Sequence, residues 1–301
     1  MISKTELNGI DILMIESKSL AVSIVPSLGG KILRLYNKKL SKDFLWTNQN
    51  LPLQKQETGA DYDSNFIGAI DELIPNDISE TIDGIDYPDH GELWTTALQY
   101  EQTKDTIIVH GSLPLSGLYY SKTLFLDAEA PVLHLQYLIK NETNELRHFL
   151  WKLHAALTIE AGDKLVTDAK WGQVVDPAYS RFADTTPFQW PVIENVDAAI
   201  VPPKTSAVDF FYLYDTPKGE MSLVNKNDTA LFCYSYDKNV FPYQWYFASY
   251  GGFLNHYTAI LEPCTNMPLS VNEAIQKGQC AVLQPGESLQ TSIQIYAGEN
   301  K

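Results

Sequence analysis

Three stretches of the sequence combine ionisable side chains with apolar neighbours, the setting in which acid–base chemistry is common. The first, residues 68–94, contains the adjacent carboxylates Asp71 and Glu72 and closes with the run DHGELW at 89–94. A histidine among carboxylates can exchange a proton near neutral pH, because its ordinary pKa is about 6.5. The structural alternative is a turn or helix start for the acid pair and a loop histidine beside a glycine for His90.

The other two stretches supply a second histidine and a further carboxylate. His154 lies among apolar residues in 151–156 (WKLHAA), where a histidine is more often a satisfied core residue than a catalytic one. Glu262 follows a three-residue apolar run within 242–268. A carboxylate at the end of a buried strand costs desolvation energy unless it is paired or used, and its alternative is an edge acid in solvent.

Aromatic residues accompany these groups. Tyr243 and Trp245 share a stretch with Glu262, and Trp94 follows the first histidine cluster. Aromatic faces can stack on the apolar C–H faces of sugars, although the same rings could fill a core.

The charge balance narrows the class of partner. Lys and Arg number 22 against 37 Asp and Glu, which gives a net charge of −15. Such a field repels polyanions, so we expect neither nucleic acid nor an anionic membrane surface as a partner. Only three of the basic residues are arginine, the side chain that usually clamps phosphate, which disfavours a phosphorylated substrate.

No segment predicts export or membrane insertion. The opening residues MISKTE are not a basic region followed by an apolar run, and no stretch approaches the roughly 18 continuous apolar residues of a spanning helix. The three cysteines are odd in number and lack CxxC spacing, so neither a disulfide framework nor a thiolate zinc site is suggested. We therefore expect a cytoplasmic protein.

The elements that must position these groups follow a period of two residues. Alternating apolar and polar side chains, rich in β-branched and aromatic types, predict strands at 20–25, 106–109, 131–140, 229–236 and 289–296. Turns with glycine or proline separate strand signals at roughly ten-residue intervals, which predicts an all-β sandwich forming a single domain over 1–301.

Two segments depart from the strand pattern. Ser270 and Glu273 have capping-box spacing and Gly278 is placed to end a helix, which predicts one short helix between them. Residues 168–209 have little periodicity and are expected to form a long loop or irregular insertion that lines the ligand site.

Together these stretches resemble the aldose 1-epimerase (galactose mutarotase-like) family, over nearly the whole chain. The markers, in order, are SLGG at 27–30, DELIP at 71–75, DHGELW at 89–94, LHAA at 153–156, FPY at 241–243 with Trp245, YGG at 250–252, EPCT at 262–265 and PGE at 285–287. The resemblance implies a β-supersandwich with few short helices, in agreement with the period-two pattern.

The resemblance also implies an activity, the interconversion of the α and β anomers of a sugar by a cofactor-independent isomerase. Glu262 matches the general base, His154 the general acid, and His90 a second histidine that holds the sugar by a hydrogen bond. The residues expected to bind substrate are Asp71, Glu72, Glu92, Trp94, Tyr243 and Trp245. The expected partner is a neutral monosaccharide, bound by a monomer or homodimer, with no cofactor and no metal.

The sequence departs from the best-known galactose mutarotases at two points. Their Asn-Arg pair would fall near Asp71 and Glu72, so the cationic sugar-binding residue is missing. Their strand aspartate has no clear match, and its nearest candidates are Asn225, Asn227 and Asp228. The identity of the sugar is therefore open, and the shortage of arginine argues against the hexose-6-phosphate branch.

Three other functions compete with this interpretation. A non-catalytic carbohydrate-binding or sugar-sensing protein could share the fold. A glycoside hydrolase or lyase could use paired carboxylates such as Glu92 and Glu262, although hydrolysis has little need for two histidines. A zinc site could use two histidines and a glutamate, but the sequence has no HExxH motif.

Overall fold

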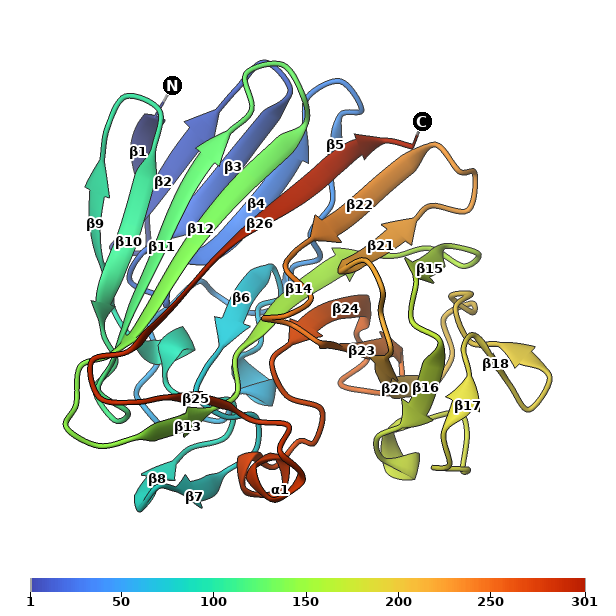
Figure 1. Ribbon diagram of the computed structural model, residues 1–301. Helices are drawn as coiled ribbons and strands as arrows, with labels where there is room; N and C mark the ends of the chain where they lie inside the picture. Colours follow the sequence, from blue (N-terminus) through green and yellow to red (C-terminus); the bar gives the residue numbers. More distant parts are fainter. Residues whose placement is uncertain (1, 301) are drawn as a thin grey trace.

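Two large antiparallel sheets dominate the computed structural model, which describes residues 2–300 (Figure 1). The first sheet has 12 strands, in the spatial order β1 (Ile2–Leu7), β2 (Ile10–Glu16), β3 (Leu20–Val25), β4 (Lys31–Asn37), β6 (Ile70–Leu73), β14 (Lys152–Thr158), β24 (Tyr257–Cys264), β23 (Tyr243–Tyr250), β20 (Val208–Tyr214), β16 (Trp171–Val174) and β17 (Phe188–Gln189), with β5 (Lys42–Asp43) paired to β4.

The second sheet has eight strands and packs against part of the first. Its order is β15 (Lys164–Thr167), β21 (Glu220–Val224), β22 (Ala230–Ser235), β26 (Ser288–Glu299), β12 (Val132–Asn141), β11 (Leu118–Leu126), β10 (Ile107–Ser112) and β9 (Gln99–Gln102). Three two-stranded ribbons complete the strands: β7 (Glu80–Ile82) with β8 (Ile85–Tyr87), β13 (Arg147–Phe149) with β25 (Ala281–Leu283), and β18 (Val192–Ile193) with β19 (Val196–Asp197). The predicted all-β class is confirmed.

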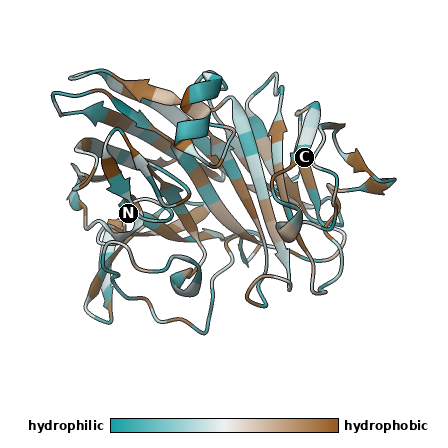
Figure 2. Ribbon diagram, turned by 90° about the horizontal axis from the view of Figure 1, so that it is seen from below, coloured by the Kyte–Doolittle hydropathy of each residue, from teal (hydrophilic) through white to brown (hydrophobic). Residues whose placement is uncertain are grey.

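All five predicted strand segments are strands, because each can bury one or both faces. In β26, Ile293 and Ile295 are buried while the intervening Gln294 is exposed, and Figure 2 shows such changes of hydropathy along many strands. The β3 strand, between β2 and β4, is buried at every position. The largest apolar cluster takes side chains from both sheets, so it is the core of a sandwich.

The predicted helix is α1 (Val271–Lys277). The Ser270 hydroxyl accepts a hydrogen bond from the backbone N–H of Glu273, and Gly278 ends the helix with a left-handed φ of 65°. The other helical elements among residues 2–300 are short 3-10 turns: η1 (Asp63–Asn65), η2 (Leu93–Thr95) and η3 (Pro177–Tyr179). In this part of the chain no helix has the length and apolar character needed to cross a membrane.

The segment 168–209 extends the edge of the first sheet with short strands. It supplies β16 and β17, the projecting β18–β19 ribbon and the turn η3 (Figure 1). The side chain of Asp176 accepts a hydrogen bond from the backbone N–H of Ala178, which fixes the start of η3. The predicted irregular insertion is therefore present, and it reaches the cavity described next.

Candidate functional site

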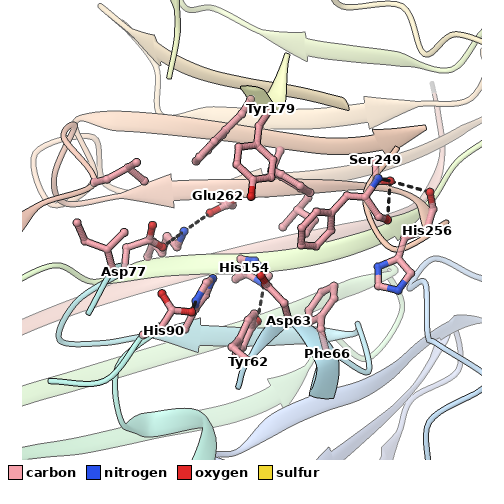
Figure 3. Close-up of a pocket in the computed structure, with 18 of the residues that line it drawn as sticks. Tyr62, Asp63, Phe66, Asp77, His90, His154, Tyr179, Ser249, His256 and Glu262 are labelled. Atoms are coloured by element: carbon pink, nitrogen blue, oxygen red, sulfur yellow. Dashed lines mark hydrogen bonds and ion pairs between the residues drawn. The ribbon is translucent and has the colours of Figure 1, made fainter. Parts of the chain in front are cut away.

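A cavity of about 320 Å³ opens on the face of the first sheet that is turned away from the sandwich core. This volume is at the lower end of the range of about 300–1,000 Å³ that is usual for small-molecule sites. The lining residues are Tyr62, Asp63, Phe66, Asp77, Ile78, Asp89, His90, Lys152, His154, Asp176, Tyr179, Phe210, Phe247, Ser249, Phe253, His256, Thr258, Ile260, Glu262 and Leu269. Figure 3 shows Asp77, His90 and Glu262 near one end and His256 near the other.

Cross-strand register places the ionisable groups in one row. His154 on β14 pairs directly with Asp71 on β6. The flanking pairs Lys152–Cys264 and Ala155–Leu261 bring His154 opposite Glu262 on β24. Side chains directly opposite one another on neighbouring strands share a face, so the three stand side by side on the cavity side of the sheet.

His154 is oriented by a carboxylate behind it. Its Nδ1 lies 3.0 Å from Asp71 Oδ1 and 3.4 Å from the Tyr62 hydroxyl. Burial alone would raise the pKa of Asp71, but Lys31, whose Nζ lies 2.5 Å from Oδ2, and His154 outweigh burial and hold that pKa well below its usual range. With Nδ1 bound to Asp71, Nε2 is the ring nitrogen that can meet a ligand.

Glu262 is held by a buried lysine. Its Oε2 lies 2.6 Å from Lys152 Nζ, which is also 2.5 Å from Asp77 Oδ1. The ammonium lies 4.4 Å from the centre of the Trp245 ring. Burial disfavours a charged lysine, but the carboxylates of Asp77 and Glu262 outweigh burial and raise the pKa of Lys152. The wall of the cavity therefore contains a fixed cation between two carboxylates.

His90 projects from a tight turn at the same end of the cavity. Its φ of 60° is left-handed and its N–H donates to the carbonyl oxygen of Asp77 at 2.7 Å. The ring stacks on Tyr62 with centroids 3.9 Å apart, and Nδ1 lies 2.7 Å from Asp89 Oδ2. Burial lowers the pKa of His90, but Asp89 and Asp77 outweigh it and raise the pKa above its ordinary value. With Nδ1 bound to Asp89, the ring of His90 can donate a hydrogen bond into the cavity through Nε2 when it is protonated.

The next residue explains why the turn is tight. Gly91 has a φ of 69°, and a Cβ on it would lie 2.3 Å from the carbonyl oxygen of Ile74. Only glycine fits this approach, so it fixes where the preceding histidine leaves the backbone.

The opposite end of the cavity is aromatic. Tyr179 from η3 packs on Phe253 with ring centroids 6.0 Å apart, and Phe247 meets Phe253 edge to face at 5.5 Å. The ring of His256 lies next to that of Phe66, with ring centroids 6.3 Å apart. These rings present apolar faces to the cavity.

The six residues expected to contact substrate are not among those that line the cavity. Asp71 lies behind His154 and reaches the cavity only through it. Glu72, the next residue along β6, points to the opposite face, into the sandwich, because successive side chains of a strand alternate. There it pairs with Lys122 Nζ at 2.8 Å and accepts a hydrogen bond from the Tyr137 hydroxyl at 2.6 Å. The prediction of a sugar contact by either carboxylate is corrected accordingly.

The side chains of Glu92 and Trp94 are also engaged by other protein groups outside the cavity lining. The Glu92 carboxylate accepts backbone hydrogen bonds from Leu115 at 2.6 Å and Ser116 at 2.9 Å. It is therefore occupied away from the cavity and forms no carboxylate pair with Glu262. Trp94 meets Tyr62 edge to face at 5.1 Å and supports that ring from outside the cavity.

Trp245 and Tyr243 lie beside the site rather than in its lining. Trp245 is fully buried, and its indole Nε1 donates to the carbonyl oxygen of Asn266 at 2.9 Å, because a buried indole N–H needs a partner. It shares the cavity face with Glu262, its cross-strand partner, but lies under Lys152. Tyr243 begins β23 two positions away.

Sequence reasoning missed several residues that line the cavity. Lys152 was detectable, because it lies two positions from His154, and residues two apart on a strand share a face. Tyr62 and Asp77 lie in loops without a recognisable motif. Asn225, Asn227 and Asp228 lie at the turn between β21 and β22 and not in the cavity lining.

The residues of 2–300 include no group of three or more His, Cys, Asp or Glu side chains arranged to hold a metal ion. A carboxylate and an imidazole line the same cavity. Each of them could exchange a proton with one bound ligand.

Comparison with known proteins identifies the fold. No protein-family model matches the chain, and no curated protein matches its sequence. Solved structures do match. A candidate aldose 1-epimerase from Escherichia coli K12 aligns with a TM-score of 0.72 at 14% identity, covering 96% of this chain and 99% of that one. A galactose mutarotase-like protein from Clostridium acetobutylicum aligns with a TM-score of 0.72 at 12% identity, covering 99% and 98%.

A third match is a galactose mutarotase related enzyme from Lactobacillus acidophilus, with a TM-score of 0.71 at 12% identity over 96% of this chain and 98% of that one. The chain has the galactose mutarotase-like fold, and the resemblance drawn from its sequence is confirmed at the level of the fold.

Proposed function

We propose that this protein is an aldose 1-epimerase that interconverts the α and β anomers of a neutral monosaccharide. One observation supports this above all: an imidazole backed by a carboxylate, His154 with Asp71, stands beside a carboxylate backed by an ammonium, Glu262 with Lys152, on one wall of a cavity. Mutarotation needs one group that takes a proton from the C1 hydroxyl and one that gives a proton to the ring oxygen, two oxygens bonded to the same carbon.

In the proposed mechanism Glu262 takes the proton from the C1 hydroxyl while protonated His154 gives its Nε2 proton to the ring oxygen. The C1–O5 bond breaks as the C1–O1 bond becomes a carbonyl, which yields the open-chain aldehyde. Rotation about C1–C2 presents the other carbonyl face, and the ring closes as both protons return. The carboxylate of Asp71 stabilises the positive ring of His154. The C–O bond that breaks forms again, no group leaves and the sugar is neither oxidised nor reduced, so the reaction requires no cofactor.

His90 has a positioning role in this proposal. Its protonated ring, held by Asp89 and stacked on Tyr62, donates a hydrogen bond to the C1 or ring oxygen. The aromatic end of the cavity packs against the C–H face of the sugar.

The charges of the lining support a neutral sugar. Five lining residues carry carboxylates: Asp63, Asp77, Asp89, Asp176 and Glu262. Lys152 is the one lysine or arginine in the lining among the described residues, and two of these carboxylates already engage it. A phosphate or carboxylate on the sugar would meet uncompensated negative charge.

The proposal is tested by polarimetry, or by NMR exchange between anomers, on freshly dissolved α-anomers of a panel of neutral sugars. We expect at least one sugar to equilibrate faster than in buffer. If a folded protein accelerates none but binds a sugar, the chain is a carbohydrate-binding protein with this fold.

A further inference from the structure

Lys152 occupies an unusual place for a lysine. Its side chain is 3% exposed, yet it lines the cavity and joins Asp77 and Glu262, which come from different parts of the chain. The other two buried lysine–carboxylate pairs differ from it. Lys122 meets Glu72 inside the sandwich, and Lys31 meets Asp71 behind His154.

The groups that face Lys152 fix its charge. Asp77, in the loop after β6, and Glu262, on β24, each lie within 2.6 Å of its ammonium, and the Trp245 ring of β23 covers it at 4.4 Å. His90, when protonated, opposes the charge of Lys152, and its Nδ1 is paired with Asp89. Cys264 on β24 stays a neutral thiol because burial raises its pKa. Two anions and one aromatic face therefore surround the ammonium, and they outweigh its burial.

Resting on the proposed function, we propose that Lys152 is the positioning cation of the base: it binds Oε2 of Glu262, turns Oε1 toward the sugar hydroxyl, and balances the carboxylate charge until the proton arrives. Asp77 holds Lys152 in place, and through its backbone carbonyl it also holds the N–H of His90. One residue thus links the base to the second histidine.

In this arrangement the proposed base, Glu262, and the proposed acid, His154, are each connected to a different buried lysine. Glu262 meets Lys152 directly, whereas His154 is connected to Lys31 through Asp71. The positive charge of Lys152 also excludes a different reaction, the formation of an imine with the sugar aldehyde. A neutral amine beside an open-chain aldehyde would form an imine with loss of water, but an ammonium has no lone pair for that attack.

The charge of Lys152 can be measured without any activity. In wild-type protein the side-chain NMR signal of Lys152, assigned with Lys152→Arg, is expected to stay that of an ammonium up to about pH 10, where free lysine titrates. Sodium borohydride added with an aldose is expected to leave Lys152 unmodified by mass spectrometry. Loss of the ammonium signal near neutral pH, or a reduced sugar adduct on Lys152, would overturn the proposal.

The positioning role is tested by Lys152→Met and Lys152→Arg, with Lys39→Met as the control, since Lys39 is exposed and pairs with Glu299 on the surface. Lys152→Met is expected to lower kcat by about 10-fold or more while KM stays within about threefold. A carboxylate without its cation binds a proton more readily, so the acidic limb of the kcat/KM profile should move up by about 1 pH unit or more.

Lys152→Arg keeps the charge and should return the acidic limb to its wild-type pH, even if its bulk lowers kcat. Equal kcat/KM profiles for Lys152→Met and Lys39→Met would refute the role, as would a loss of kcat without movement of the limb. If Lys152→Met does not fold, Asp77→Asn serves instead: it leaves the ammonium paired with Glu262 alone, so the acidic limb should move to lower pH, and an unmoved limb would refute the role. A wild-type protein with no activity on any sugar refutes the proposed function, while the NMR and borohydride measurements still report on the cation.

Discussion

Asp71 and Glu72 are neighbours in the chain and face opposite sides of strand β6. Asp71 binds Nδ1 of His154 at the cavity wall, whereas Glu72 pairs with Lys122 in the core. The sequence suggests one acidic site, but alternation along the strand places Asp71 at the cavity wall and Glu72 in the core. Substitution of each carboxylate by its amide therefore gives a matched test.

Asp71→Asn is expected to lower kcat by at least about 10-fold with little change in KM, because an amide cannot stabilise the positive ring of His154 or specify its tautomer. Anomer exchange by NMR measures the change. Asp61→Asn, at an exposed carboxylate nearby, is the control. Wild-type kcat in Asp71→Asn would show that His154 does not depend on this carboxylate.

Glu72→Gln is expected to act on stability instead. It leaves the ammonium of Lys122 buried without its counter-charge, which should lower the free energy of unfolding by about 3–5 kcal/mol. Urea unfolding measures this loss, and kcat of the folded fraction should stay near wild type. A stable variant with impaired catalysis would contradict the assignment of Glu72 to the core.

Stability should depend on pH through His90. Its folded-state pKa is raised, so its contribution is fully present below the unfolded value of about 6.5 and is lost as pH rises through the folded-state pKa. His90→Asn suits the left-handed backbone and lacks this titration. The difference in unfolding free energy between wild type and variant should therefore shrink from about pH 5 to pH 8. A difference that is constant or grows would contradict the raised pKa.

Anionic sugars should be poor substrates. Burial raises the pKa of Asp63, and within residues 2–300 its carboxylate has no hydrogen-bond or ion-pair partner. With the other lining carboxylates it should reduce kcat/KM for a hexose 6-phosphate or a uronic acid by about 100-fold or more relative to the neutral sugar. Asp63→Asn should narrow that gap. Equal kcat/KM for both kinds of sugar would show that the carboxylates do not face the ligand.

Local patterns predicted the elements well. The period of two located the strands that include β3, β12 and β26, and the spacing of Ser270, Glu273 and Gly278 located α1 with both caps. These features depend on interactions within a few residues or on one face of one strand, and a single sequence records such interactions directly.

The site was predicted in part, for a physical reason. The sequence identified Glu262, His154 and His90, and the structure brings all three to one cavity, while their catalytic roles stay predictions. Glu72 and Glu92 were misassigned, because their partners lie 50 and 23 or 24 residues away and no local pattern records a long-range pair. Alternation along a strand does place Asp71 and Glu72 on opposite faces, and it places Lys152 and His154 on the same face. The sequence therefore contains enough information to assign the face of each of these residues.

The most direct test of the account compares anomer exchange in wild-type protein, Glu262→Gln and His154→Asn, with binding of the same sugar measured alongside. Each variant should fold, bind the sugar with nearly unchanged affinity and exchange its anomers at least about 100-fold more slowly, the scale for losing a general acid or base. Full exchange in Glu262→Gln would contradict the claim that this carboxylate and the facing imidazole move the two protons.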